Sequence, residues 1–259
     1  MHVAHALSRS AEFDLVHNHL DWLPLAFSHH CQVPLVTTIH GFSGEAILPA
    51  YRDARSAYVS ISDADRSPEL DYCGTVHHGI DITQFVFSPR AGDQLIILGR
   101  IHPDKGTAAA IDIADLAARP LVIAGPIADQ AFFDDLIAPR VDGHNVRYLG
   151  SVGPIQRSEI LGDSAALLHP IGFDEPFGLS VVEAMATGTP VIAYNRGSML
   201  EIIDHCVTGM LVTNVEEAVT AVPTAAALDR SSIRDVVERR FTAERMVEDY
   251  LAVYASLLR

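Results

Sequence analysis

Residues 94–118, QLIILGRIHPDKGTAAAIDIADLAA, contain the pattern on which the fold prediction rests. The segment starts with a short apolar run, continues through a turn rich in Pro, Gly and charge, and ends with apolar residues at helical spacing. A continuous apolar run of this length predicts a strand that is buried on both faces. A strand followed by a turn and a helix predicts a βαβ unit, and therefore a parallel sheet covered by helices.

The same order of elements recurs along most of the chain. Between Gln94 and Val212 we expect six strands with helices between them, such as the helix expected at residues 127–137, which is enough for a complete doubly wound domain. Before Phe85 we expect three strands and a short fourth at residues 75–78, which is about half of such a domain. The nine clear strand candidates are residues 14–19, 34–39, 57–61, 94–98, 120–124, 145–149, 165–169, 190–193 and 209–212.

These patterns divide the chain into three parts. Residues 1–87 are predicted to form a partial N-terminal Rossmann-like domain, and residues 88–230 a complete C-terminal one. The segment FSPRAGDQ, residues 87–94, combines Pro, Gly and charge, and is predicted to link them. Residues 231–259 are predicted to be helical, with apolar residues on one face. The predicted fold class is therefore α/β, with two Rossmann-like doubly wound domains, of which the N-terminal one is incomplete.

Composition limits the classes of function. Lys and Arg total 18 against 33 Asp and Glu, so the net charge is −15, which repels nucleic acid at long range. The chain has neither an apolar run that could span a membrane nor an opening that resembles a secretory signal. The 3 cysteines are scattered, which fits a reducing compartment and argues against a zinc site. We therefore expect a cytoplasmic protein that does not bind nucleic acid and has no transmembrane segment.

Two cations lie in the turn that follows the strand at residues 94–98. Arg100 and Lys105 stand at the carboxyl end of that strand, in a turn shaped by Pro103 and Gly106. Ligands of open α/β sheets bind beyond the carboxyl ends of strands, and helix N-termini favour anions. The turn therefore favours a phosphate-binding site. The alternative is a solvated loop with incidental charges.

The stretch GFDEPFGLSVVEAM, residues 172–185, places two carboxylates on either side of a turn. Glu175 lies in the loop, where a carboxylate is available to a ligand. Ser180 and Glu183 match the S-x-x-E pattern of a capping box, so Glu183 has a purely structural alternative role. The amides around Gly178 predict a second anion site at the start of a helix. A carboxylate next to an anion site suits a ligand with hydroxyls beside phosphate, such as a nucleotide sugar.

His40 ends the strand at residues 34–39 and places an imidazole at the carboxyl edge of the first sheet. An ordinary histidine at a strand end is the alternative. The 13 histidines are numerous, but their spacing matches no common metal site, so we expect no metal ion.

Several blocks of the chain, taken together and in order, resemble glycosyltransferase family 4. This family contains retaining nucleotide-sugar transferases with two Rossmann-like domains in the GT-B architecture. The matching blocks are GRIHPDKG (99–106), LVIAGP (121–126), NVRYLGSV (145–152), GFDEPFGLSVVEAMATGTPVIA (172–193) and RGSMLEIIDHCVTGMLV (196–212), with VSISDADR (59–66) and HHGIDITQF (77–85) in the first domain. The fourth block contains the E-x7-E signature of the family, which is specific in this context.

The resemblance implies a role for each matching residue. Arg100 and Lys105 would neutralise the donor diphosphate, Glu183 would bind the ribose, and Glu175 would hold hydroxyls of the transferred sugar. His40 would face the reacting sugar, and it completes the expected catalytic set with Glu175, Arg100 and Lys105. The remaining donor-binding positions are Gly99, Gly125, Phe177, Gly178, Leu179 and Ser180.

The resemblance also implies an activity. It predicts retaining transfer of a hexose from a nucleoside diphosphate sugar, by default UDP-glucose, to an unknown acceptor, without metal or cofactor. The C-terminal helix would pack back on the N-terminal, acceptor-side domain. Family members carry roughly a hundred further N-terminal residues, about half of a Rossmann-like domain, so an incomplete sheet is expected that offers an edge for association. The alternatives are a nucleotide-sugar-binding module or split transferase without turnover, and a GT-B epimerase of nucleotide sugars.

Overall fold

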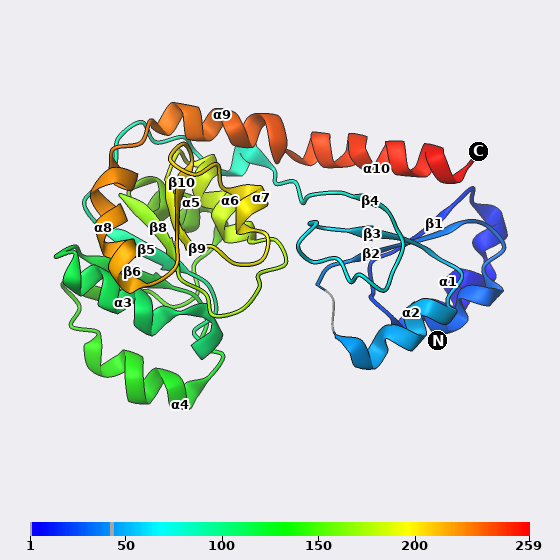
Figure 1. The fold of residues 1–259 in the computed structure, drawn as a ribbon, viewed down its shortest axis with the longest axis horizontal. Helices are drawn as coiled ribbons and strands as arrows, with labels where there is room; N and C mark the ends of the chain where they lie inside the picture. The colour runs from blue at the N-terminus through cyan, green and yellow to red at the C-terminus, as the bar shows by residue number, and fades with distance from the viewer. Residues whose placement is uncertain (1, 42–43) are drawn as a thin grey trace. The chain divides into compact units, whose positions relative to one another are not determined.

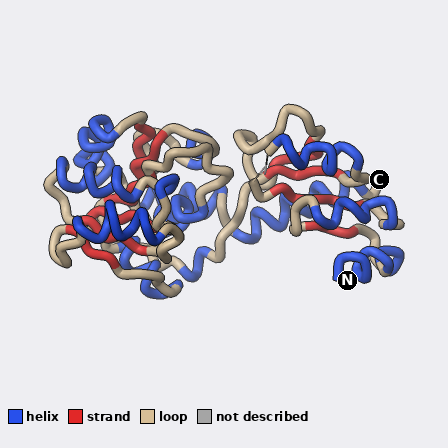
Figure 2. The backbone as a smooth tube through the Cα atoms, turned by 90° about the horizontal axis from the view of Figure 1, so that it is seen from below, coloured by secondary structure: helices blue, strands red, loops and turns tan. Residues whose placement is uncertain are grey.

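The computed structural model of the protein describes residues 2–41 and 44–259, which form two compact units (Figure 1). The smaller unit comprises the residues up to His78 together with Glu244–Arg259, and the larger unit comprises Gly79–Ala243. Each unit is built on a parallel sheet, and Figure 2 shows the strands inside each unit with helices around them. The fold class is therefore α/β, as the alternation of strand and helix patterns predicts.

The larger unit contains a sheet of six parallel strands. Its central strands are almost fully buried, because helices cover both faces, which explains their uninterrupted apolar sequences. Each strand lies within one or two residues of the position predicted for it. The strands are β5 (Leu95–Leu98), β6 (Leu121–Ala124), β7 (Val146–Tyr148), β8 (Ala166–His169), β9 (Val191–Tyr194) and β10 (Gly209–Val212).

Helices connect these strands. Apolar side chains of α3 and α8 pack on one face of the sheet, while α6 packs against both α5 and α9. The short helix α4 continues as a π-helical turn, Phe133–Ile137, and a 3-10 turn, Ala138–Arg140. The helices are α3 (Thr107–Leu116), α4 (Gln130–Phe132), α5 (Pro154–Gly162), α6 (Leu179–Ala186), α7 (Met199–Ile202), α8 (Val215–Ala226) and α9 (Arg230–Arg240).

The order of the strands across the larger sheet is β10-β9-β8-β5-β6-β7. The chain moves outward from β5 through β6 to β7, and then returns to place β8 on the other side of β5. The direction of winding therefore reverses between β5 and β8. In open α/β sheets, ligands bind outside the carboxyl ends of the strands at such a switch point. The loops that follow β5 and β8 are thus the parts of this unit best placed to form a site.

Within its described residues, the smaller unit has a parallel sheet with the order β1-β2-β3-β4. The short fourth strand occupies Tyr72–Thr75 and not the predicted residues 75–78. Its register pairs Thr75 with Ser60, which is the last residue of β3, so the ladder ends there. The first three strands are β1 (Val16–Asn18), β2 (Leu35–Ile39) and β3 (Ala57–Ser60).

Helices cover both faces of the smaller sheet. On one face, Tyr250 and Val253 of α10 (Ala243–Leu257) pack against Val36 and Val59. The opposite face carries α2 (Leu48–Asp53) and a 3-10 segment (Leu23–His30), and α1 (His2–Ser8) lies against this segment. Figure 1 shows α10 and α2 on opposite sides of the strands. The second face is filled by a cluster of Leu25, Leu35, Ile39, Tyr51 and Tyr58.

The division between the two units falls at different residues from those indicated by the sequence pattern. The segment predicted as a linker, residues 87–94, belongs to the larger unit. The amide of Ser88 donates to the carbonyl of Thr187 at 3.0 Å, and the amide of Gly92 donates to that of Asp163 at 3.1 Å. Pro, Gly and charge therefore mark a segment bound to the surface of a domain, and the boundary lies earlier, at Gly79.

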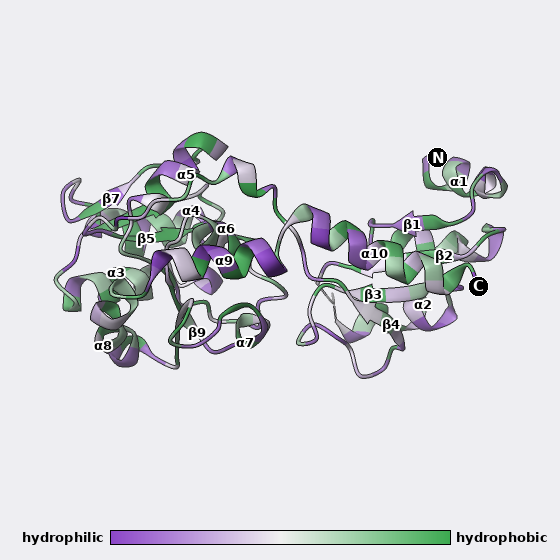
Figure 3. Cartoon of the chain, turned by 90° about the horizontal axis from the view of Figure 1, so that it is seen from above, coloured by the Kyte–Doolittle hydropathy of each residue, from purple (hydrophilic) through white to green (hydrophobic). Residues whose placement is uncertain are grey.

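The segment predicted as one C-terminal helix, residues 231–259, forms two helices. Between them the amide of Ile80 donates to the carbonyl of Phe241 at 2.9 Å, and the amide of Ala243 donates to Ile80 at 3.0 Å. This pairing interrupts the helical hydrogen bonds, so α9 ends at Arg240. Figure 3 shows much of α9 as hydrophilic, because only a narrow apolar face of this helix is buried in the larger unit.

Two further observations concern local structure. Asp63-Ala64-Asp65 lies in a turn in which Ser62 Oγ accepts from the amide of Asp65 at 3.1 Å. A serine side chain that bonds the local backbone in this way offers an alternative to helical bonding. Within residues 2–41 and 44–259, no helix is both long enough and apolar enough to cross a bilayer.

Candidate active site

The loops after β5 and β8 touch at the switch point of the larger sheet. The first loop contains a 3-10 turn, Pro103–Lys105, that ends at Gly106. Gly106 has a φ of 72°, and a Cβ atom there would lie 2.1 Å from the carbonyl oxygen of Pro170. Glycine is therefore required for this close approach. A hydrogen bond of 2.9 Å from the amide of Gly172 to the carbonyl of Asp104 joins the same two loops.

Lys105 and Glu175 form an ion pair across this contact. Nζ of Lys105 is 2.7 Å from Oε2 of Glu175, and the two side chains are 19% and 14% exposed. The ammonium group also lies 4.6 Å from the centroid of the Phe173 ring. Partial burial strengthens the attraction, because less water screens it. The cation expected to meet phosphate and the carboxylate expected to meet sugar hydroxyls are thus within hydrogen-bond distance of each other.

The loop after β9 holds the backbone of Glu175 from the other side. The amide of Ser198 donates to the carbonyl of Glu175 at 2.9 Å, and Nη1 of Arg196 donates to the carbonyl of Gly172 at 2.9 Å. Gly197 has a φ of 54°, and a Cβ atom there would lie 2.4 Å from both N and O of Glu175. The loop that carries Glu175 is therefore fixed between two neighbouring loops.

Helix α6 begins differently from the sequence prediction. The N-cap is Gly178, with a φ of 89°, and no side chain of the described residues caps the helix. Ser180 lies inside the first turn, so it cannot act as the N-cap of a capping box with Glu183. The capping role considered for Glu183 is therefore wrong. The amides of Gly178, Leu179 and Ser180 lie at the helix N-terminus, where the first N–H groups have no partner within the helix.

Glu183 pairs with a cation that the sequence analysis did not identify. Nη1 of Arg157, on α5, lies 2.8 Å from Oε1 of Glu183, whose side chain is 13% exposed. Burial raises the pKa of the Glu183 carboxyl, and attraction to the Arg157 guanidinium opposes this rise. Glu175 and Glu183 are thus held by two different cations. They do not form the facing pair of carboxylates that glycosidases place on either side of one bond.

Arg100 and two glycines mark the ends of β5 and β6. Arg100 is exposed directly after β5 and forms no ion pair with another described residue. Gly99 donates its amide to Ala124 at 3.0 Å. Gly125 has a φ of 146°, and a Cβ atom there would lie 1.8 Å from the carbonyl oxygen of Gly99. The two strand ends therefore pass so closely that only glycine fits at residue 125.

Two buried side chains lie beneath these loops. His169 ends β8, and its Nε2 has no hydrogen-bond partner among the described residues. Burial, together with repulsion from Lys105, lowers the pKa of His169 to about 3, so its imidazole is neutral at pH 7. The ring of Phe177 packs edge-on against Phe241 and is 2% exposed. The Phe177 ring is therefore enclosed, and the Phe177 carbonyl accepts a hydrogen bond from Ser198 Oγ at 2.9 Å.

His40 lies in the smaller unit, where four imidazoles gather. Nε2 of His40 is 2.9 Å from Nδ1 of His19. The His40 ring stacks on the ring of His78, with 5.2 Å between the ring centroids. The ring centroids of His17 and His19 are 3.9 Å apart. Partial burial and repulsion from His19 lower the pKa of His40, and the nearby Asp21 opposes this. In the described parts of the chain, no group of three or more His, Cys, Asp or Glu side chains is arranged to hold a metal ion.

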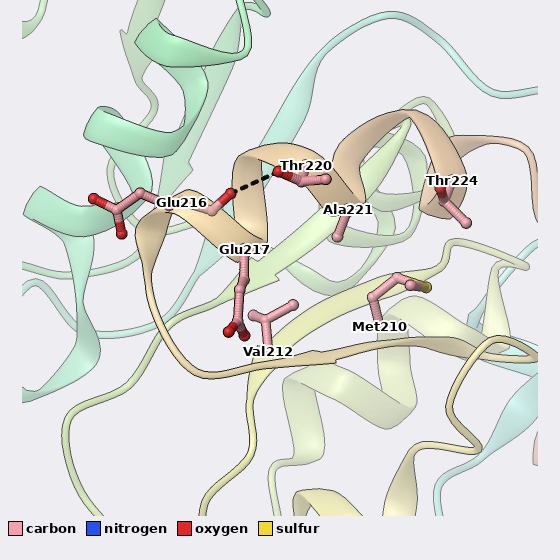
Figure 4. Close-up of a pocket in the computed structure, with 7 residues that line it drawn as sticks. All are labelled: Met210, Val212, Glu216, Glu217, Thr220, Ala221 and Thr224. Carbon is pink, nitrogen blue, oxygen red and sulfur yellow. Dashed lines mark hydrogen bonds between the residues drawn. The ribbon is translucent and has the colours of Figure 1, made fainter.

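A surface pocket of about 410 Å³ lies between β10 and α8, away from these residues (Figure 4). Figure 4 shows Met210 and Val212 of the strand beneath Glu217 and Ala221 of the helix. The acidic side chains at its edge would repel a diphosphate. No residue expected to bind the donor lines it. The lining residues are Met210, Val212, Glu216, Glu217, Thr220, Ala221 and Thr224.

Sequence reasoning missed two positions that shape the site, Gly197 and Arg157, and it gave Gly106 a role only in the turn after residues 94–98. Gly106 and Gly197 permit the close contacts around Glu175, and both lie in blocks that carried the family resemblance. Their positions beside Lys105 and Arg196 were the available signal. Arg157 had no such signal, because it lies in an amphipathic helix where a charged residue is ordinary. Only the packing of α5 against α6 brings Arg157 to Glu183.

The model of the family "Glycosyl transferases group 1" matches residues 82–232, which is more than half of the chain. The matched region lies entirely in the larger unit. It contains every predicted site residue except His40.

Individual proteins show the same relationship. Glycogen synthase of Mycobacterium tuberculosis is 28% identical over 272 residues, covering 92% of this chain and 63% of that protein. Phosphatidyl-myo-inositol mannosyltransferase of the same organism is 25% identical over 237 residues, covering 85% and 61%. The chain thus spans about three fifths of the length of these relatives. Among solved structures, Anabaena HepE in complex with UDP and glucose has a TM-score of 0.82 at 21% identity, over 98% of this chain and 81% of that one. This likeness shows a GT-B fold.

Proposed function

Because the chain belongs to the group 1 glycosyl transferases, we propose that it moves a hexose from a nucleoside diphosphate sugar to an acceptor hydroxyl with retention of configuration. The observation that carries this proposal is the 2.7 Å contact between Lys105 and Glu175 at the switch point. It joins a cation suited to phosphate and a carboxylate suited to hydroxyls. A nucleoside diphosphate sugar presents both kinds of group side by side.

UDP-glucose is the proposed donor. The complex of HepE with UDP and glucose supports this choice, because that protein shares the fold of this chain. A family member named as a mannosyltransferase makes GDP-mannose the donor to compare.

The proposed chemistry depends on stabilising the leaving group. As the glycosidic bond breaks, negative charge develops on the nucleoside diphosphate, and fixed positive groups lower the energy of that state. Lys105 and the exposed Arg100 follow the same strand, and the amides of Gly178 and Leu179 begin α6. These groups supply positive charge and N–H donors without a metal ion. We therefore propose metal-independent transfer.

Glu175 is proposed to orient the sugar and not to attack it. In the free protein its carboxylate accepts a hydrogen bond from Lys105. A diphosphate carries more negative charge than one carboxylate, so a bound donor draws the ammonium group towards phosphate. The Glu175 oxygens then become available to the sugar hydroxyls. Attack by the acceptor on the face that the diphosphate leaves retains configuration without an enzyme nucleophile.

Donor binding and turnover test the proposal. The wild-type chain is titrated by calorimetry with UDP-glucose and GDP-mannose, and the preferred donor is then incubated with and without simple sugar acceptors. We expect a dissociation constant between about 1 µM and 1 mM, release of the nucleoside diphosphate with an acceptor, and an unchanged anomeric configuration by proton NMR.

Each other outcome identifies an alternative. Binding without release of nucleoside diphosphate under any condition would assign a binding module. Conversion of the donor into an isomeric sugar nucleotide without acceptor would assign an epimerase. Failure to bind either donor would overturn the proposed function.

A further inference from the structure

Arg157 and Glu183 lie on neighbouring helices at the carboxyl edge of the larger sheet. Each helix follows a loop from that edge, Arg157 lies in the first turn of α5, and Glu183 lies in the second turn of α6. Their contact, 2.8 Å from Nη1 to Oε1, joins residues that are 26 positions apart in the chain. The pair is therefore a tertiary contact beside the loops that form the candidate site.

This ion pair is a poor means of stabilising the fold. Arg157 Nε is buried and has no hydrogen-bond partner among the described residues. An unpaired buried N–H destabilises a fold, and a buried ion pair is often replaced by apolar side chains without loss. A contact that leaves such an atom unsatisfied points to a role in ligand binding.

Arg157 is the charged side chain that bonds Glu183. Glu159, two residues further along α5, projects from the opposite side of that helix. On α9, Arg230 and Arg234 direct their guanidinium groups to other acceptors, among them the carbonyls of Gly162 and Ala186. Burial raises the pKa of Glu183, and Arg157 alone among the charged neighbours lowers it.

The strands beneath α6 add no charge at neutral pH. His169 at the end of β8 has its pKa lowered to about 3 by burial, so it is neutral. Burial raises the pKa of Tyr194 at the end of β9, so its phenol is also neutral. The charge state of Glu183 therefore depends on Arg157.

We infer that Arg157 is a positioning residue for the nucleoside half of the donor, which holds the Glu183 carboxylate as a charged, oriented acceptor for the two ribose hydroxyls. This inference rests on the proposed function, because it takes a nucleoside diphosphate as the ligand. An ionised carboxylate only accepts hydrogen bonds, whereas a protonated one must donate from one oxygen. Protonated Glu183 therefore cannot accept from Arg157 and from both hydroxyls together.

The test compares Arg157→Met and Arg157→Lys with the wild type, using UDP, GDP and inorganic pyrophosphate as ligands in calorimetry from pH 5.5 to 9. In Arg157→Met, Glu183 loses the cation that keeps it ionised. We expect at least tenfold weaker binding of the preferred nucleoside diphosphate at pH 6.5, with the loss shrinking as pH rises. Arg157→Lys restores most of the affinity, and pyrophosphate binding stays unchanged because Arg100 and Lys105 provide it.

A second measurement does not depend on any ligand. The carboxyl carbon of Glu183 is titrated by NMR in protein labelled with ¹³C-glutamate, and its signal is identified by its loss in Glu183→Gln. Arg157→Met is expected to change the ionisation constant of Glu183 by at least tenfold, towards the protonated form. The double variant Arg157→Met/Glu183→Gln has no buried unpaired charge, so it serves as the folded reference if Arg157→Met is unstable.

The outcomes separate the inference from the proposed function. If the wild type binds neither UDP nor GDP, the proposed function fails and this inference falls with it. If the wild type binds a nucleoside diphosphate, but Arg157→Met weakens it equally at every pH or Glu183 titrates identically in both proteins, only the inference is overturned.

Discussion

The carboxyl edges of the two sheets carry different chemistry. In the larger unit, the loops and helices at this edge bear two ion pairs, Lys105 with Glu175 and Arg157 with Glu183. In the smaller unit, the corresponding edge bears imidazoles, and His40 lies against both His19 and His78. Both sheets are parallel, so strand topology alone does not determine what lies at the edge.

The difference shows how burial acts on each kind of group. A buried carboxylate stays charged when a cation meets it, so the larger edge keeps charges that suit an anion with hydroxyls. In the imidazole cluster the Asp21 carboxylate opposes the lowering of the His40 pKa, but burial with mutual repulsion lowers the pKa of both His17 and His78 to about 4. The imidazoles of His17 and His78 are therefore neutral at pH 7, and neutral imidazole suits hydroxyl ligands and not phosphate.

The largest expected effect comes from removing the cation of the first ion pair. Lys105→Ala should weaken UDP by about 2.7 kcal/mol, or roughly 100-fold, because a charge-assisted bond to phosphate is lost. Uridine, which lacks the diphosphate, should bind as before. Calorimetry with both ligands measures the two changes. Equal losses for UDP and uridine would contradict the assignment of Lys105 to the diphosphate.

Arg90→Ala provides the matched control for this loss of charge. Arg90 is an exposed cation that precedes β5, and so lies on the amino side of the sheet. The Arg90→Ala variant should bind UDP with a free energy within about 0.5 kcal/mol of the wild-type value, because surface substitutions usually have effects of this size.

A smaller effect of opposite sign is expected at the other member of the pair. Glu175→Gln frees Lys105 from its carboxylate partner, so UDP should bind more tightly, by about 1 kcal/mol or roughly fivefold. The affinity for UDP-glucose should not rise in this way, because the glutamine amide is a weaker acceptor for sugar hydroxyls. The measured quantity is the ratio of the two dissociation constants. An unchanged or weaker affinity for UDP would show that Glu175 does not compete with phosphate for Lys105.

The smallest expected effect is a loss of stability of the smaller unit in acid. The folded pKa of His17 is about 4, below its ordinary value near 6.5, so the unfolded state binds more protons between these pH values. Stability is therefore full above about pH 6.5 and falls as pH drops towards about 4. With solvent screening, we expect a loss of at most about 1 kcal/mol from this residue. Trp22 is the single tryptophan of the chain and lies in this unit, so its fluorescence reports the melting of the unit.

His17→Gln tests that assignment. Glutamine still offers a donor and an acceptor near Tyr254 and Thr38, which bond the His17 ring at 2.6 and 2.8 Å. The variant should lose less stability between pH 6.5 and 4 than the wild type. If the stability of both proteins depends on pH in the same way, the loss of stability in acid belongs to other groups.

Much of the fold was predictable because strand and helix patterns are local. Buried strands such as Leu121–Ala124 show as short apolar runs, and each run in the larger unit became a strand. Boundaries between units were less predictable. The segment around Ser88 has the composition of a linker, yet backbone hydrogen bonds to distant residues tie it to the larger unit. The break between α9 and α10 likewise depends on Ile80, about 160 residues earlier in the chain.

The candidate site was predictable as separate stretches. Lys105 and Glu175 each follow a strand, and that position alone marks a residue at the carboxyl edge of a parallel sheet. Their pairing was not predictable, because it requires β5 and β8 to be neighbours although two strands separate them along the chain. The S-x-x-E pattern at Ser180 predicts the wrong start of the helix, since the left-handed conformation of Gly178 starts the helix two residues earlier.

The sequence by itself therefore determined the α/β class, the positions of the strands and the residue types at their ends. Hydrophobic periodicity and the side chains that follow a strand depend only on residues that are neighbours in the chain. The tertiary structure decided which charges meet. Glu183 is not a cap, because α6 begins at Gly178, and its carboxylate pairs instead with Arg157, which lies on another helix. Long-range partners of this kind determine charge state and orientation, and only the packing of the whole larger unit brings them within a hydrogen bond.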